Sequence, residues 1–171
     1  MNADVAGVAE LGGAPGAEAA RREFLTFRLG EERYGIDILQ VQEIREIDRV
    51  TRVPHVKRFV RGVINLRGAI VPIVDLGLMF GFAEPLPLEK ANAIVLNVDR
   101  RMVGLVVASV SDVVGLADEE ILPPPELGDR AIARAISGIG TREAPGQEAA
   151  ASSLLLLDVQ HLLGRIREDR E

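Results

Sequence analysis

Hydrophobic residues in this sequence fall into short runs separated by turn-forming residues. Across residues 23–29, Leu25, Phe27 and Leu29 alternate with polar positions. This period of two predicts a β-strand with one buried face. A turn then leads to a return strand at 34–37. Similar apolar runs predict extended segments at residues 47–53, 91–98, 102–108, 110–116 and 154–159.

The hydrophobic period changes at three places, where short helical segments are expected. Ile38, Val41 and Ile44 are spaced three apart, which fits a short helical turn across these residues. A second helical turn is predicted at residues 76–81. Residues 160–168 are amphipathic, with three large apolar residues on one side, and predict a C-terminal helix.

The hairpin expected at residues 62–75 is the strongest local signal. Two apolar runs rich in β-branched residues flank Arg67 and Gly68. Gly68 can adopt a positive φ without a Cβ clash, which a tight reversal needs. Pro72 lacks a backbone N–H and therefore predicts an edge strand or a bulge. Arg67 at a rigid tip would present a fixed fork of donors to a partner, although a solvated turn residue would look the same in sequence.

Many short strands at close spacing indicate a mainly β fold of two small antiparallel barrels. Each barrel would be marginal alone at about 70 residues, so we expect the two to pack together and to form a groove at their seam. Residues 1–20 are expected to be a disordered leader, and residues 21–168 the folded part. We place the subdomains at roughly 34–88 and 89–155, completed by the first strand and the terminal helix, with a mobile loop at 144–152 and a tail at 169–171.

Composition and charge narrow the classes of function. The 171-residue chain is 47% hydrophobic and 27% charged, with a formal net charge of -6, no cysteine and one tyrosine. The acidic balance disfavours a nucleic-acid partner. The absence of cysteine excludes disulfides and thiolate metal sites. No apolar stretch approaches the ~20 residues of a membrane span, and no secretion signal opens the chain, so a soluble cytoplasmic protein is the simplest interpretation.

The sequence offers no set of residues typical of catalysis or metal binding. His55 and His161 are far apart and lack metal-ligand spacing, so each is expected to be a surface or capping residue. Ser109, Ser111 and Asp112 lie close together without a nucleophile-elbow motif around them. A phosphate-binding loop is also missing. We therefore expect a binding module that is not an enzyme and needs no cofactor.

Charged and apolar residues of the first barrel are candidates for a binding surface. Glu43 and Arg67 carry opposite charges and could pair across this barrel. The ridge of Ile38, Val41 and Ile44 lies beside Glu43 in the sequence and could either dock a partner or pack into the core. Asp37 and Asp75 could be a carboxylate pair, but each ends an apolar run, so we expect them to cap local structure.

Several long motifs, in series, resemble the CheW family of chemotaxis coupling proteins. They are YGIDILQVQEIR at 34–45, VINLRG at 63–68, VPIVDL at 71–76, IVLNV at 94–98, and then VGLVV at 103–107 with VSDV at 110–113. The resemblance runs from about Glu23 to the terminal helix. It implies two five-stranded SH3-like barrels in a non-enzymatic scaffold. Such a scaffold joins the cytoplasmic tip of chemoreceptors to the regulatory domain of the histidine kinase CheA, with which it alternates in rings beneath receptor arrays.

The resemblance also implies which residues bind each partner. Receptor contact would fall on residues lining the groove between the barrels, namely Ile38, Val41, Glu43, Ile44, Arg67, Gly104, Val110 and Val113. Kinase contact would involve Val50, Val60 and Arg61. A second kinase contact in the ring would involve Leu122 and Leu127, where relatives can carry a basic and an aromatic residue.

Two alternatives to a chemotaxis coupler are retained. The chain could couple receptors in a chemosensory pathway that controls pili or development. It could also be a small β-barrel nucleic-acid-binding module, which would need a basic face bearing aromatic residues. We expect no metal, no nucleic-acid partner and no insertion into the membrane, but recruitment from the cytoplasm to membrane-associated receptor arrays.

Overall fold

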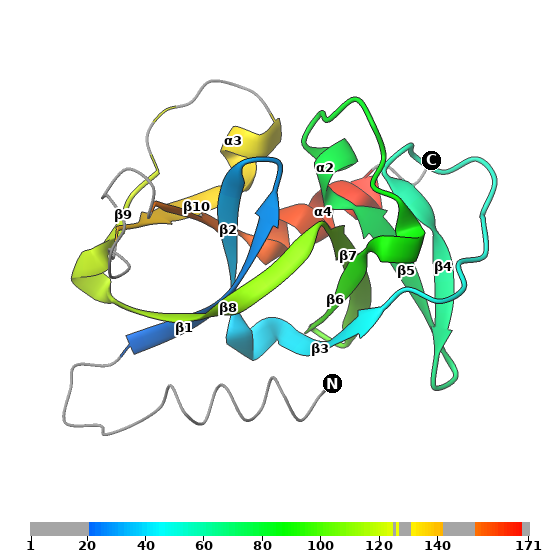
Figure 1. The fold of residues 1–171 in the computed structure, drawn as a ribbon, viewed down its shortest axis with the longest axis horizontal. Coiled ribbons are helices and arrows are strands. Elements are labelled where there is room, and N and C mark those ends of the chain that lie inside the picture. The colour runs from blue at the N-terminus through cyan, green and yellow to red at the C-terminus, as the bar shows by residue number, and fades with distance from the viewer. Residues whose placement is uncertain (1–20, 125, 127–130, 142–152, 169–171) are drawn as a thin grey trace.

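Two β-sheets make up most of the computed structural model, which describes residues 21–124, 126, 131–141 and 153–168 (Figure 1). The predictions for residues 1–20, 144–152 and 169–171 lie outside these residues. The six-stranded sheet has the order β8–β1–β2–β11–β10–β9. Its strands are β1 (Arg21–Leu29), β2 (Glu32–Asp37), β8 (Ser109–Ala117), β9 (Ile121–Leu122), β10 (Ile136–Gly140) and β11 (Leu154–Leu157).

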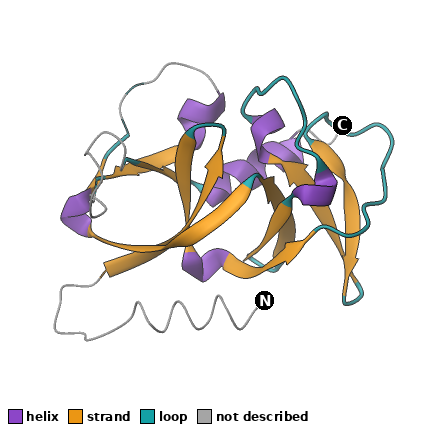
Figure 2. Ribbon diagram, viewed as in Figure 1, coloured by secondary structure: helices purple, strands orange, loops and turns teal. Residues whose placement is uncertain are grey.

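The second sheet has five strands in the order β3–β6–β7–β5–β4. They are β3 (Val41–Glu46), β4 (Val60–Leu66), β5 (Ala69–Asp75), β6 (Asn92–Val98) and β7 (Arg101–Val107). The helices are short and lie between strands or at the end of the fold (Figure 2). They are η1 (Ile38–Gln40), α2 (Leu76–Met79), η2 (Leu88–Lys90), η3 (Asp118–Glu120), α3 (Ala131–Ala135) and α4 (Val159–Glu168). The prediction of a mainly β fold with small helices and a C-terminal helix is confirmed.

The first two and the last four strands of the chain belong to the six-stranded sheet, and the whole five-stranded sheet forms in between, before α4 ends the described part. Most strands pair with antiparallel neighbours, but β2 pairs in parallel with β11, and β5 with β7. In the sequence, the five-stranded sheet therefore spans residues 41–107, and the strands of the six-stranded sheet lie on either side of this range. This division differs from the expected subdomain boundary at residues 88 and 89, because β6 and β7 pair with strands of the first half.

One hydrophobic core joins the two sheets. It contains Phe27 and Tyr34 from the six-stranded sheet, Ile94 and Leu105 from the five-stranded sheet, and Leu162 from α4. Each of these side chains is 1% exposed or less. Because both sheets contribute to the same packed cluster, the barrels bury apolar surface that neither could bury alone. This confirms the expectation that they pack together.

The hairpin of β4 and β5 forms as predicted. Its turn consists of Arg67 and Gly68, whose φ angles are 54° and 89°. Two positive φ angles in a two-residue loop match the right-handed twist of the flanking strands. The Gly68 N–H donates to Asn65 Oδ1 at 2.8 Å and closes the turn further. Arg67 is thereby held at the tip of a structured hairpin.

Of the two positions predicted for Pro72, the edge strand is wrong, while the register shift of the β4–β5 ladder, between Val60 and Gly62, lies opposite the next residue of β5. The strand of Pro72, β5, lies between β4 and β7 and is not at an edge. Pro72 is paired in register with Val63 of β4. The parallel register with β7 begins at Ile73, one residue later. The missing N–H therefore falls where pairing with β7 has not yet started, and an interior strand can accommodate the proline.

The helical turn predicted around Ile38 is correct only for three residues. Asp37 Oδ1 accepts a hydrogen bond from the Leu39 N–H at 2.9 Å and caps the short helix η1. At Val41 the backbone becomes extended, with φ −89° and ψ 122°. The rest of the segment forms β3 and pairs with β6. Pairing with a neighbouring strand outweighs a spacing that persists for only seven residues.

The extended segment predicted at residues 47–53 does not form a strand. Thr51 alone makes an isolated bridge with Val63, with two backbone hydrogen bonds of 2.9 Å. This contact places the segment along the outer side of β4, an end strand of the sheet. The segment therefore covers a strand edge that would otherwise present unpaired backbone groups.

Candidate partner-binding surfaces

Glu43 and Arg67 connect the two end strands of the five-stranded sheet. Glu43 lies on β3, and Arg67 lies in the turn that follows β4. Arg67 Nη1 donates to Glu43 Oε2 at 2.8 Å, and Nη2 donates to Oε1 at 3.2 Å. A contact through two parallel hydrogen bonds fixes the guanidinium in one orientation. The pairing predicted from the two charges is confirmed, and it ties the hairpin tip to β3.

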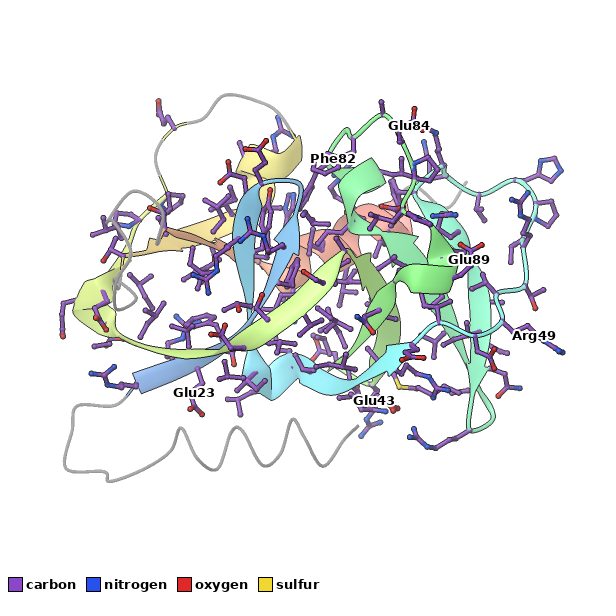
Figure 3. All side chains as sticks on the ribbon, in the orientation of Figure 1. Glu23, Glu43, Arg49, Phe82, Glu84 and Glu89 are labelled. Carbon is purple, nitrogen blue, oxygen red and sulfur yellow. The ribbon has the colours of Figure 1, made fainter. Side chains whose placement is uncertain are left out.

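The two members of this ion pair differ strongly in exposure. The Glu43 side chain is 4% exposed, whereas that of Arg67 is 59% exposed. The hydrogen bond from Arg67 holds the pKa of Glu43 below its ordinary value, against the opposing effect of burial. Glu43 in turn raises the pKa of Arg67. A buried carboxylate thus anchors an arginine that is itself largely exposed. Figure 3 labels Glu43 beside β3.

Apolar residues of the predicted receptor-binding set lie where the two sheets meet. The segment η1 contacts β1 of one sheet and β6 of the other. Ile38 in η1 is buried and belongs to the shared core. Val41 and Ile44 on β3, and Val110 and Val113 on β8, are half-buried and pack against that core. Within the ridge of Ile38, Val41 and Ile44, Ile38 therefore packs into the core, while Val41 and Ile44 remain partly accessible.

Gly104, another member of the predicted receptor-binding set, is buried within β7. A Cβ atom at this position would lie 2.8 Å from Ile73 Cδ1 on β5. Such a distance is shorter than ordinary van der Waals contact, so a side chain here would push Ile73 aside. In this structure Gly104 allows β7 and β5 to pack closely.

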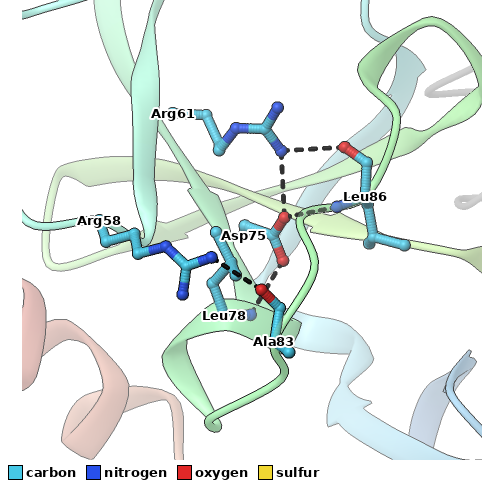
Figure 4. A network of polar contacts seen from close by, with 6 residues as sticks. All are labelled: Arg58, Arg61, Asp75, Leu78, Ala83 and Leu86. Carbon is cyan, nitrogen blue, oxygen red and sulfur yellow. Dashed lines mark hydrogen bonds and ion pairs between the residues drawn. The ribbon is translucent and has the colours of Figure 1, made fainter.

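Arg61, predicted to contact a kinase, is engaged within the fold (Figure 4). Its Nη1 donates to Asp75 Oδ2 at 3.1 Å and to the Leu86 carbonyl oxygen at 2.9 Å. Asp75 is fully buried and also accepts hydrogen bonds from the backbone N–H groups of Leu78 and Leu86. Asp75 thus caps α2, as predicted, and Asp37 caps η1. The network holds the loop after α2 against β4.

The other residues of the predicted kinase-binding set are spread over the molecule. Val50 and Val60 are half-buried and lie before and at the start of β4. Leu122 is 49% exposed on β9, the end strand of the six-stranded sheet. Leu127 lies outside the described residues. Within the described residues, Leu122 therefore lies on a different sheet from Val60 and Arg61.

An apolar groove of about 480 Å³ lies beside Val60. It is formed by the loop before β4, the β4–β5 hairpin, β7 and α4. Three of its large hydrophobic residues are exposed, with Val53 at 38%, Val56 at 40% and Ile70 at 64%. Its lining residues are Val53, Val56, Lys57, Val60, Val63, Ile70, Pro72, Arg101, Met102, Val103, Leu163 and Ile166.

Sequence reasoning missed several exposed apolar residues, among them Ile70 and Leu39. Val71 and Ile73 are buried, so alternation along β5 places Ile70 on the outer face. An isoleucine at an outward position was a signal that could have been noticed. Leu39 is 89% exposed in η1. This exposure could not be predicted from the sequence, because the spacing of three suggested a longer helical turn.

The described residues contain no cluster of side chains that could hold a metal ion. Within the same part of the chain, no helix is long and apolar enough to cross a membrane. His55 is exposed in a turn with a φ of 64°. The His161 N–H donates to Asp158 Oδ1 at 3.1 Å in the first turn of α4. His55 is thus a surface residue, as expected. His161 is half-buried, and its Nε2 atom is buried with no hydrogen-bond partner in the described part of the chain, so the surface or capping role predicted for it is wrong.

The fold defines a mainly β protein of two packed SH3-like barrels, and the structure adds partly exposed apolar surfaces to it. A family model described as CheW-like domain matches residues 23–167. The chain therefore belongs to the CheW family, whose members are scaffold and coupling proteins of chemotaxis.

Individual relatives agree with this assignment. The chain is 44% identical over 161 residues to the chemotaxis protein CheW of Klebsiella aerogenes, covering 94% of this chain and 90% of the relative. It is 40% identical over 124 residues to a probable chemotaxis protein CheW of Rhizobium etli, covering 71% and 80%. The crystal structure of the scaffolding protein TtCheW from Thermoanaerobacter tengcongensis superposes with a TM-score of 0.71 at 26% identity, covering 85% of this chain and 89% of that one.

Proposed function

We propose that this protein is a non-enzymatic adaptor of the cytoplasm. It joins the cytoplasmic tips of chemoreceptors to the regulatory domain of the histidine kinase CheA. One surface binds the receptor and two others bind kinase domains, so that adaptor and kinase assemble into rings beneath receptor arrays. The observation that carries this proposal is the Glu43–Arg67 pair, in which a buried carboxylate fixes an exposed arginine beside a half-buried apolar seam.

The receptor-binding surface is assigned to the seam between the sheets. Val41 and Ile44 come from the five-stranded sheet, and Val110 and Val113 from the six-stranded sheet. Half-buried apolar side chains beside an anchored cation suit an amphipathic helix, whose apolar face covers them while a polar group accepts from Arg67. Because the arginine is already held by Glu43, little side-chain entropy is lost when a partner binds it.

The first kinase-binding surface is assigned to the groove beside Val60. Its lining is mostly apolar, and Ile70 protrudes into it with 64% of its surface exposed. Exposed apolar residues around a groove are typical of protein–protein contact sites. The second kinase-binding surface is assigned to Leu122, which lies on an end strand and is half exposed. Arg61 follows Val60 directly in β4, and its guanidinium is held by Asp75.

The receptor assignment is tested with a variant that removes the charges but keeps the shape of the pair. Arg67→Glu would place a second carboxylate against the buried Glu43 and threaten the fold. The double variant Glu43→Gln/Arg67→Gln instead leaves a neutral amide pair. We expect it to lose binding to a receptor-tip fragment in co-sedimentation while it still binds the CheA regulatory domain. The exposed Arg49, substituted as Arg49→Gln, is the control. Unchanged receptor binding by a folded double variant would refute the assignment.

The kinase assignment is tested in the groove. Ile70→Glu places a charge where the proposed contact is apolar, and the exposed position should tolerate it in the free protein. We expect loss of binding to the CheA regulatory domain with receptor binding retained. Kinase binding equal to that of the wild-type protein would show that the groove does not take part.

A further inference from the structure

Leu39 is the most exposed of the large hydrophobic residues in the described part of the chain. Its side chain is 89% exposed, compared with 64% for Ile70 and 49% for Leu122. An isolated exposed leucine needs no special explanation in itself. Leu39 differs because its backbone is fixed and its neighbours belong to the proposed receptor-binding surface.

Local structure holds Leu39 in place. Its N–H donates to Asp37 Oδ1 at 2.9 Å, and the N–H of Val41 closes the turn on the Ile38 carbonyl oxygen. Ile38 is 7% exposed and anchors η1 in the shared core. Ile38 points inward and Leu39 outward from the same short turn. The leucine is therefore presented on a fixed support and not on a free loop.

The position of η1 relates Leu39 to both sheets. This turn contacts β1 of the six-stranded sheet and β6 of the five-stranded sheet, and it lies at their junction in Figure 1. The chain continues from it directly into β3, which carries Val41 and Ile44. The exposed leucine therefore lies two residues before Val41 in the chain, in a turn that contacts both sheets.

We infer that Leu39 is a specificity-determining contact of the receptor-binding surface, where it inserts between apolar side chains on the helical tip of a chemoreceptor. This inference rests on the proposed function. A leucine that becomes fully buried on binding is among the larger single contributions that an apolar contact can make. Its removal should weaken receptor binding by about tenfold to a hundredfold.

Three variants test this inference. Leu39→Ser removes the apolar side chain, Leu39→Met keeps apolar bulk, and Phe82→Ser is a control for an exposed apolar residue outside the proposed binding surfaces. Dissociation constants for a receptor-tip fragment and for the CheA regulatory domain are measured by calorimetry, and thermal unfolding is recorded for each variant. Leu39→Ser is expected to weaken receptor binding at least about tenfold, with kinase binding and thermal stability unchanged. Leu39→Met should restore most of the affinity, and Phe82→Ser should leave both receptor and kinase binding intact.

The outcomes separate this inference from the proposed function. If the wild-type protein binds the receptor fragment and Leu39→Ser binds it equally well, the role of Leu39 is refuted and the coupling function stands. If the wild-type protein itself does not bind the receptor fragment, the coupling function fails, and the role of Leu39 fails with it. A large loss of thermal stability in Leu39→Ser would show a structural role and would also refute the inference.

Discussion

Replacement of the buried Asp75 by asparagine should destabilise the fold much more than the same change at Asp37. Both aspartates cap a short helix, so the substitution removes the same atoms and charge at both positions. Their surroundings differ. Asp75 is fully buried and paired with Arg61, whereas the Asp37 side chain is 28% exposed.

The magnitude follows from the contacts of the Asp75 carboxylate. Oδ2 accepts from Arg61 at 3.1 Å and from the Leu86 N–H at 2.9 Å, and Oδ1 accepts from the Leu78 N–H at 3.1 Å. An asparagine has one acceptor oxygen, so its NH₂ group must face at least one donor. Arg61 would also be left without its counter-charge, and its side chain is 19% exposed. Loss of one partner of a buried ion pair costs about 3–5 kcal/mol, and partial access of water to Arg61 favours the lower end.

We therefore expect Asp75→Asn to lower the free energy of unfolding by about 3 kcal/mol, and the melting temperature by roughly 6–12 °C. Asp37→Asn should cost less than about 1 kcal/mol, since asparagine caps helices as well as aspartate and the contact with Arg22 is exposed. Urea unfolding can be followed by tyrosine fluorescence, because the chain has one tyrosine, the buried Tyr34, and no tryptophan.

Two results would refute this reasoning. One is an Asp75→Asn variant within about 1 kcal/mol of the wild-type protein, which would mean that the carboxylate is not essential to the network. The other is additive behaviour of Asp75→Asn and Arg61→Met. Contacting partners should show a coupling energy of about 1 kcal/mol or more in a double-mutant cycle.

Three further predictions concern other parts of the fold. Gly62→Ala should lower the free energy of unfolding by at least about 2 kcal/mol in urea. The Gly62 φ is 142°, and a Cβ atom there would clash with the Thr51 carbonyl oxygen. A neutral effect would mean that the segment before β4 moves freely. The pKa of Glu43 is lower in the folded protein than its ordinary value of 4.5, so the stabilisation from its ionised form is complete above that pH and is lost as the pH falls below it. As the pH falls through this range, the free energy of unfolding should decrease more steeply in the wild-type protein than in Glu43→Gln/Arg67→Gln. Equal slopes in the two proteins would contradict a stabilising role of the ionised Glu43. Burial raises the pKa of Tyr34 to about 12, so ultraviolet titration should detect tyrosinate only near that pH, and ionisation near 10 in the folded protein would be inconsistent with the packed core.

Local signals predicted the elements whose structure depends on a few adjacent residues. The hairpin turn could be read from Gly68 and its flanking runs, because positive φ angles depend on side-chain type. The helix caps Asp37 and Asp75 were predictable because each aspartate ends an apolar run, where its carboxylate can accept from backbone N–H groups of the following turn. The pairing of Glu43 with Arg67 was suggested by charge, but their very different exposure was not. Exposure depends on how the end strands of a sheet meet, and the sequence does not display this directly.

Predictions that depended on long-range pairing were less accurate. Pro72 was expected at an edge strand or a bulge, but β5 is not at an edge, because it gains a parallel neighbour, β7, from a later part of the chain. The groove beside Val60 was not foreseen because it combines segments from four parts of the sequence. Arg61 was assigned to partner contact by resemblance, and its bond to Asp75 emerged only when β4 and β5 were placed side by side.

The central claim is that one folded adaptor carries separate surfaces for receptor and kinase. Sedimentation velocity of the wild-type protein with a receptor-tip fragment and the CheA regulatory domain tests this claim most directly. We expect a ternary complex, and we expect the affinity for the receptor fragment to be the same with and without saturating kinase domain. Displacement of the receptor fragment by the kinase domain, or failure of the protein to bind either one, would contradict the account.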